Sequence, residues 1–203
     1  MELQEALRQI STIRDAAVKA DLFRGYSAAT AGFSAAIGIA AAIAQAAWIP
    51  QPWEQFDLYL YLWCGVAVVS IVVCGGELWC RARRLDSPLA MRQTWHAVEQ
   101  FLPCLVAGAL VTVVIAQYPD GGWMLPGLWA TFFSLGMFAS LRFLPRAMVV
   151  VAIHYLVCGV LCLCLAKGDD TLSPWAMGLT FGIGQSMAAG ILYWTLERRH
   201  GET

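Results

Sequence analysis

The feature that constrains this chain most is a series of uninterrupted apolar runs, of which residues 101–116, FLPCLVAGALVTVVIA, are a clear example. A helix needs about 20 apolar residues to cross the hydrocarbon core of a bilayer, and several runs approach that length. Composition agrees, since 59% of the residues are hydrophobic and 13% are charged, against about 45–50% and about 25% in soluble domains. The sequence therefore predicts an all-α integral membrane protein. Its net charge of −1 does not indicate nucleic-acid binding.

The apolar runs divide into six predicted transmembrane helices, joined by short polar links such as YPDGG and KGDDTLS. We expect one transmembrane domain over 26–199 and a cytoplasmic tail over 200–203, without a separate enzymatic domain. The first twenty residues lack the apolar stretch of a signal peptide, so the first span is expected to direct insertion. Pro103 and Pro126 fall inside the third and fourth spans and predict kinks there. The spans are predicted at 26–48, 58–78, 101–116, 123–141, 147–166 and 174–196.

Residues 1–25 precede the first span and predict an amphipathic cytoplasmic helix. Apolar residues recur at helical spacing from Leu3 to Ala17, and charged residues occupy the opposite face. Such a helix lies on a membrane surface or against a protein partner. Packing against the protein's own cytoplasmic loops is the alternative.

The distribution of basic residues predicts the orientation. With six spans, twelve of the thirteen Lys and Arg residues fall on the side of both termini, and Lys167 is the exception. Cytoplasmic segments carry such an excess of positive charge. We therefore expect both termini to be cytoplasmic. The twelve are Arg8, Arg14, Lys19, Arg24, Arg81, Arg83, Arg84, Arg92, Arg142, Arg146, Arg198 and Arg199.

Two short phrases occur twice in the same order. SPLAM at 87–91 returns as SPWAM at 173–177, and YLWCGV at 61–66 returns as YLVCGV at 155–160. The echoes predict that 26–116 and 123–196 are two three-span repeats, and an odd number of spans inserts the second repeat upside down. Transporters and channels often use this plan. The alternative is two independent helix starts, because Ser is a good N-cap and Pro suits the first helical position.

Polar residues inside the spans supply the candidate site. Ionisable groups there are costly and indicate function, so Glu77 and Glu99 are candidates for a pathway. Gln185 joins them because the repeat aligns it with Glu99, and His154 and Tyr155 rank second. The alternatives are structural: Glu77 can pair with Arg81 one turn on. Glu99 can bond a helix end or a loop Arg, and His154 can be a hydrogen-bonded core residue.

Cofactor binding is a weaker expectation. His96 and Glu99 share a helix face and would form a metal site if Glu77 came close, and His154 would be the ligand for a haem. The single copy of the His/Glu pair argues against the repeated di-metal pattern of helix bundles. The seven cysteines follow no metal-binding spacing, and we expect them to be small buried hydrophobes. No cofactor is therefore predicted.

Several phrases together resemble a family of small six-span bacterial inner-membrane proteins of no established activity. They are FRGYSAAT, VEQFLPCLVAGAL, MLPGLW, LGMFASLRFLPR and LSPWAMGLTFGIGQ, which are spread over most of the chain. The resemblance implies the same membrane architecture and a location in the bacterial cytoplasmic (inner) membrane, and it assigns no activity and no site residue.

Three functions remain open on the sequence. The first is a small transporter or channel built from two inverted repeats, which requires a polar cavity. The second is a membrane anchor or sensor that binds a cytoplasmic protein partner through its N-terminal helix. The third is a metal- or haem-binding membrane protein. The partners expected are the lipid bilayer and a second copy in a homodimer, since six helices make a thin bundle.

Overall fold

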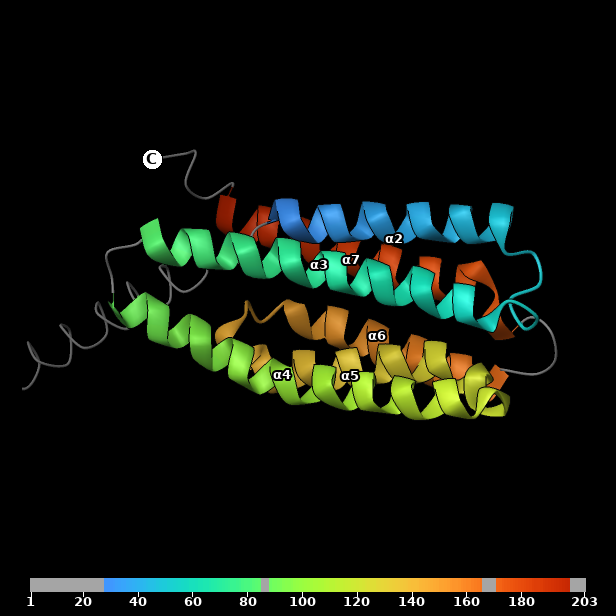
Figure 1. Cartoon of the computed structure of the whole chain (residues 1–203). Coiled ribbons are helices and arrows are strands. Elements are labelled where there is room, and N and C mark those ends of the chain that lie inside the picture. Colours follow the sequence, from blue (N-terminus) through green and yellow to red (C-terminus); the bar gives the residue numbers. More distant parts are fainter. Residues whose placement is uncertain (1–27, 85–87, 166–170, 198–203) are drawn as a thin grey trace, which may run out of the picture.

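The computed structural model describes residues 28–84, 88–165 and 171–197, and these residues form a bundle of long helices (Figure 1). The predicted N-terminal amphipathic helix and Ser87, which begins the first SPLAM phrase, lie outside the described residues. The helices are α2 (Ala28–Trp48), α3 (Phe56–Arg84), α4 (Pro88–Gln117), α5 (Leu125–Ser140), α6 (Met148–Leu165) and α7 (Pro174–Leu192), with the shorter turns η1 (Pro119–Met124), η2 (Leu141–Phe143) and the π-helical η4 (Tyr193–Glu197).

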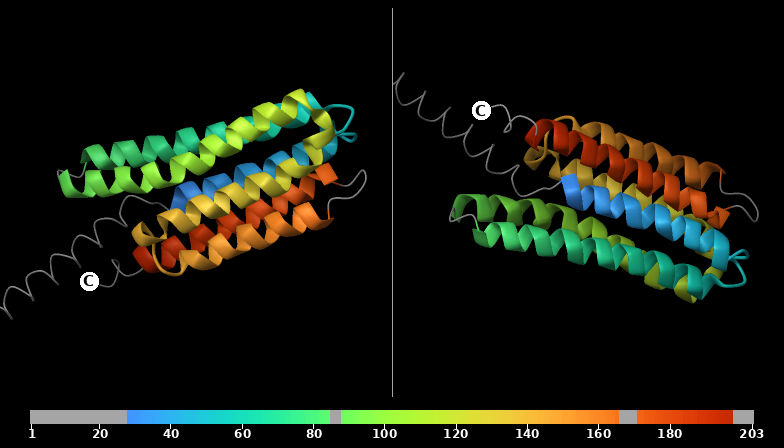
Figure 2. Two further views of the ribbon diagram at one scale, coloured as in Figure 1. Left: turned by 90° about the horizontal axis from the view of Figure 1, so that it is seen from below. Right: turned by 90° about the horizontal axis from the view of Figure 1, so that it is seen from above.

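The helices lie in two rows. Figures 1 and 2 together show α3, α2 and α7 in one row and α4, α5 and α6 in the other. Each helix packs against its neighbours in the chain, and α7 closes the ring by packing along α2. We name the end of the bundle where α3 turns into α4 the inner end, which is the predicted cytoplasmic end, and we name the opposite end the outer end.

Small residues bring the main helix pairs close together. A Cβ atom built on Gly178 would lie 2.5 Å from the Cβ of Ala42, and one on Gly182 would lie 2.7 Å from Ile39. Both glycines therefore allow α7 to lie directly against α2, which is how small residues act at helix contacts in membranes.

The core is divided into two parts along the bundle. At the outer end, α3 and α4 contribute buried side chains, among them Tyr59, Trp63 and Ile115. At the inner end, the core is formed by α2, α5, α6 and α7, around Met137 and Tyr155. No described residue of α3 between 64 and 80 is buried, and none of α4 between 98 and 107. The inner halves of α3 and α4 are therefore only half-covered by the bundle.

Five of the helical segments are long and apolar enough to cross a membrane, which indicates an integral membrane protein. They coincide with the first five predicted spans: Ala28–Trp48, Phe56–Cys80, Val98–Gln117, Pro119–Phe143 and Met148–Leu165. The sixth prediction is not confirmed. Helix α7 has 19 residues, but glycines and the polar residues Thr180, Gln185 and Ser186 make it less apolar than the others.

The arrangement does not confirm the inverted repeat. The repeat pairs α2 with α5, α3 with α6 and α4 with α7, yet α3 and α4 have 29 and 30 residues where α6 and α7 have 18 and 19. The order of the helices gives no support either. A half-turn about an axis in the membrane plane reverses the order around a ring, whereas here the helices follow one another around the ring in chain order.

Two local predictions are corrected. Pro126 does not interrupt a helix, because it stands at the first turn of α5, where η1 has just ended and its missing N–H costs nothing. Ser173 does precede α7, with Pro174 at the first helical position, but its side chain makes no capping hydrogen bond. Proline, more than serine, therefore marks this helix start. Pro103 lies inside the continuous helix α4, as expected.

Candidate functional site

Glu77 belongs to a polar cluster between the inner halves of α2 and α3, which we name the inner cluster: Thr30, Ser34, Cys74 and Glu77. The Ser34 hydroxyl lies 3.8 Å from the Cys74 thiol, and Thr30 also hydrogen-bonds that thiol. The Glu77 carboxylate lies close enough to Cys74 to act on it electrostatically. Two hydroxyls, a thiol and a carboxylate thus meet in a region that the sequence predicts to lie within the inner leaflet.

The inner cluster continues a stripe along α3 that becomes more polar towards the inner end. Leu62 and Val66 are followed at helical spacing by Ser70, Cys74 and Glu77, and all five are half-buried. Helical residues spaced by three or four share one face. This face of α3 is therefore apolar beside the outer core and polar beside the half-covered inner end.

A second set of polar groups lies between α6 and α7, which we name the middle cluster: His154, Cys158, Cys162 and Thr180. The His154 Nε2 atom lies 3.0 Å from the Thr180 carbonyl oxygen, and the Cys158 thiol lies 3.8 Å from both ring nitrogens. The Thr180 hydroxyl hydrogen-bonds both thiols. His154 is thus hydrogen-bonded inside the protein, as its structural alternative predicted.

Tyr155 lies beside the middle cluster in the inner core. It is buried and packs against Phe133 and Phe181 with ring centroids 4.6 and 5.3 Å apart. A Cβ atom on Gly184 would lie 2.6 Å from its hydroxyl oxygen, so this oxygen lies against α7 one residue before Gln185. Gln185 itself is half-buried.

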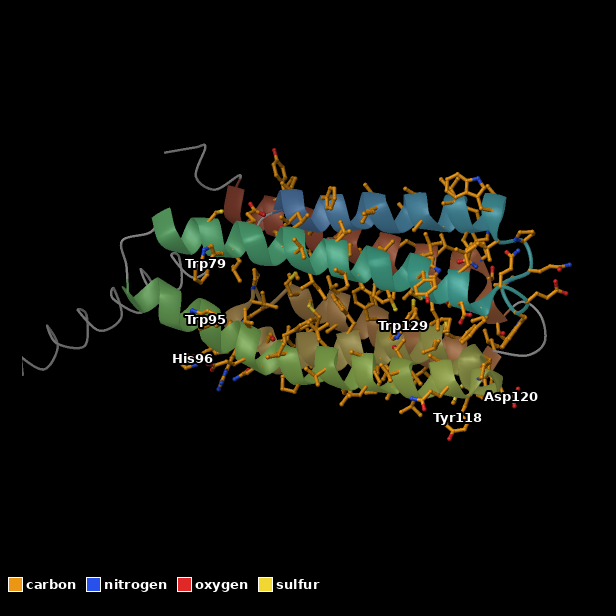
Figure 3. The ribbon with its side chains drawn as sticks, in the orientation of Figure 1. Trp79, Trp95, His96, Tyr118, Asp120 and Trp129 are labelled. Carbon is orange, nitrogen blue, oxygen red and sulfur yellow. The ribbon has the colours of Figure 1, made fainter. Side chains whose placement is uncertain are left out.

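Glu99 lies apart from both clusters, near the start of the third span. Its carboxylate oxygen lies 3.0 Å from the His96 Nδ1 atom, and the side chains are 58% and 63% exposed for His96 and Glu99. Figure 3 shows His96 with Trp79 and Trp95 at the inner end of the bundle, opposite Tyr118 and Asp120. Glu99 is the second residue of the apolar segment Val98–Gln117 and therefore lies at the inner edge of that segment.

The five predicted residues thus fall into three places. His154, Tyr155 and Gln185 lie along the α6–α7 contact, Glu77 lies between α2 and α3, and Glu99 lies on the exposed face of α4. Helices α4 and α7 are at diagonally opposite corners of the bundle (Figure 2), so Glu99 and Gln185 are not neighbours. No group of three His, Cys, Asp or Glu side chains within the described ranges could hold a metal ion.

A hydrogen-bonded clamp at the outer end was not predicted from the sequence. Gln45 is fully buried, and its amide nitrogen donates to the Leu172 carbonyl at 2.7 Å, while its oxygen accepts from the Trp63 indole at 2.7 Å. One amide therefore joins α2, α3 and the start of α7. A Gln near the end of an Ala-rich span, with a Trp early in the next, is a signal that could have found it.

Aromatic packing fills the outer core beside this clamp. Tyr59 stacks between Phe56 and Trp129, with ring centroids 6.3 and 6.4 Å apart. The Trp129 indole donates to Thr112 of α4 at 2.8 Å. The outer end is thus tied together by α2, α3, α4 and α5, whereas the inner halves of α3 and α4 are only half-covered.

Comparison with known proteins adds nothing to this picture, because no protein-family model, curated protein or solved structure matches the chain.

Proposed function

We propose that the protein is a small transporter of the cytoplasmic membrane whose described state is closed at the outer end and open to the cytoplasm at the inner end. In this proposal α7 is the sixth span, both termini are cytoplasmic, and Glu77 with the inner cluster forms the first binding region for a substrate. Glu99 lies at the mouth of the pathway, and His154, Tyr155 and Gln185 lie deeper. The proposal does not use the inverted repeat.

The observation that supports the proposal is the uneven packing of α3 and α4. Their outer halves contribute Tyr59, Trp63 and Ile115 to a buried aromatic core, and their inner halves have no buried residue among those described. A purely structural bundle gains stability by packing its helices along their whole length. The inner cluster lies on the half-covered stretch of α3, which is where water and a substrate would enter.

A second candidate is a membrane anchor that transports nothing. The observation in its favour is that the core is filled, since Gln45, Ser134 and His154 each have a hydrogen-bond partner within the bundle. In this case the inner halves of α3 and α4 face lipid. The predicted N-terminal helix would then bind a cytoplasmic partner, and a homodimer would cover part of the exposed surface.

The two candidates differ in whether water reaches Cys74, and the native cysteines provide the test. One variant keeps Cys74 as its only cysteine, and a matched variant keeps Cys64, which is also half-buried on α3. The two positions are ten residues apart, or about 15 Å along the helix. A third variant keeps Cys80, which is exposed at the inner end of the span, as a positive control.

The variants are treated in inside-out vesicles with a charged methanethiosulfonate that does not cross membranes. The transporter proposal expects Cys74 to react at least tenfold faster than Cys64, at a rate near that of Cys80. If Cys74 reacts as slowly as Cys64 while Cys80 reacts fast, the inner halves are sealed by lipid, and the anchor is the better description.

A further inference from the structure

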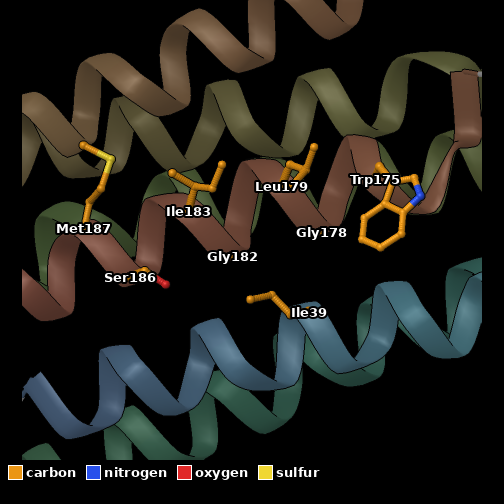
Figure 4. Close-up of a pocket in the computed structure, with 8 residues that line it drawn as sticks. All are labelled: Ile39, Trp175, Gly178, Leu179, Gly182, Ile183, Ser186 and Met187. Atoms are coloured by element: carbon orange, nitrogen blue, oxygen red, sulfur yellow. The ribbon is translucent and has the colours of Figure 1, made fainter.

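A narrow groove runs along α7 beside α2, with a volume of about 270 Å³ (Figure 4). One wall is a row of large side chains at every fourth residue of α7, the floor is a parallel row of small residues, and Ile39 of α2 stands opposite. The wall is Trp175, Leu179, Ile183 and Met187, and the floor is Gly178, Gly182 and Ser186. Only one side chain of the lining, Ser186, carries a hydroxyl.

We propose that this groove binds one acyl chain of a membrane phospholipid. Trp175 and Met187 are twelve residues apart, so the groove is about 18 Å long. Half of a hydrocarbon core is about 15 Å thick. The groove therefore matches the length of a chain within one leaflet.

The size of the groove favours a chain over a second protein helix. The floor glycines are already covered by α2, because Cβ atoms at Gly178 and Gly182 would lie 2.5 and 2.7 Å from Ala42 and Ile39. A helix with its side chains is about 10–12 Å across. The part of the groove that remains open beside α2 is too narrow for a helix. It suits a thinner, flexible and apolar ligand such as a hydrocarbon chain.

The ends of the groove fix the direction of the lipid. Trp175 stands at the start of α7, at the outer end, and its side chain is half-exposed. Indole rings favour the level of the headgroups, where their N–H can bond to a phosphate or a carbonyl. The headgroup therefore lies beside Trp175, and the chain runs inward past Leu179 and Ile183 towards Met187.

The test is photo-crosslinking of the full chain in nanodiscs that contain phosphatidylethanolamine with a diazirine near the methyl end of one acyl chain. We expect labelling of Ile183, Met187 and Ile39 to exceed that of exposed residues elsewhere, such as Val157 and Leu161 of α6, at least fivefold. Ser186→Phe places an aromatic ring in the groove, because Ser186 lines the groove and is exposed. It should lower labelling of the groove at least fivefold.

Gly190→Phe is the matched control, since Gly190 lies one turn further on, in open space and outside the groove. It should leave the labelling of Ile183 and Met187 unchanged. Even labelling of all exposed apolar residues in the unaltered chain would overturn the proposal, whatever the variants do. A variant with Met187→Cys as its only cysteine that forms a disulfide-linked dimer in the membrane would also overturn it, because a second copy would then cover the groove.

Discussion

Gly127 of α5 and Gly159 of α6 face each other so closely that a Cβ atom on either would lie within 3 Å of the other's carbonyl oxygen, at 2.8 and 2.9 Å. Each position is also crowded by a side chain, since a Cβ on Gly159 would lie 2.5 Å from the Thr131 hydroxyl oxygen and one on Gly127 would lie 2.6 Å from the Leu163 side chain. Neither a backbone carbonyl nor a helix interior can yield easily. The contact between α5 and α6 therefore depends on the absence of two methyl groups.

We expect Gly159→Ala to destabilise the protein by about 2 kcal/mol, as overpacking of a tight core does. Gly190→Ala is the control, because the Cβ atom enters open space and alanine favours a helix over glycine by about 0.5–1 kcal/mol. The two substitutions should thus shift the free energy of unfolding in opposite directions. Thermal unfolding in detergent, followed by circular dichroism, measures both. A stabilised Gly159→Ala protein would show that α5 and α6 are further apart.

Replacement of Gln45 by Leu should open the clamp at the outer end. The variant leaves the Trp63 indole N–H and the Leu172 carbonyl without their partner in a buried place, where each unpaired group costs about 1–3 kcal/mol. We expect a loss of about 2 kcal/mol or more in detergent unfolding. Gln117→Leu should change stability little, because Gln117 is exposed and bonds only within its own helix. Equal effects of the two substitutions would contradict the role of the clamp.

Tyr59→Phe should stabilise the protein, whereas Gln45→Leu should destabilise it, although both residues are fully buried at the outer end. The Tyr59 hydroxyl has no hydrogen-bond partner among the described residues. Its removal should leave the Phe56 and Trp129 stacking intact and stabilise the protein by up to about 1 kcal/mol. A decrease of more than about 1 kcal/mol in the free energy of unfolding would instead show that a water or a ligand hydrogen-bonds this hydroxyl.

Glu77→Gln should change the charge selectivity of labelling at Cys74 in the variant that keeps only this cysteine. A carboxylate beside the thiol attracts a cationic reagent and repels an anionic one, and about 1 kcal/mol of such interaction in water is about a fivefold change in rate. We expect the ratio of cationic to anionic methanethiosulfonate rates to fall about fivefold. Glu99→Gln, which changes an exposed carboxylate on another helix, should leave the ratio unchanged. If Glu77→Gln leaves the ratio of cationic to anionic rates unchanged, the Glu77 carboxylate does not act on reagents that approach Cys74.

Apolar run length predicted most of the fold. The first five spans appear within a few residues of their predicted bounds because hydrophobic length is a local property of the chain. The same measure does not distinguish α7, whose glycines lower its hydrophobicity and serve helix contacts. Gly182 lies against Ile39 of α2, and Gly184 lies against Tyr155 of α6. Which helices touch is decided by residues far apart in sequence, and the echo between SPLAM and SPWAM carried no information on that.

The surroundings of the candidate residues could be predicted only in part. Glu77 was chosen as a candidate because a carboxylate in a span is conspicuous. Thr30 and Ser34 are ordinary in an Ala-rich helix, and only the packing of α2 on α3 brings them to Glu77. The cysteines were expected to be buried, yet each is half-buried or exposed. In a membrane an apolar thiol gains nothing from burial, because lipid is as apolar as the core.

The contact between α2 and α7 also determines when the bundle can close during synthesis. The first described helix packs along the last one, with Ala42 against Gly178, so 135 residues of chain separate the two partners. Until α7 leaves the ribosome, the face of α2 that bears Ala42 has only lipid or an assisting protein to lie against. Premature termination before Pro174, where α7 begins, would remove the closing helix. It would leave a ring with a gap beside α2, a form that quality-control proteases could recognise.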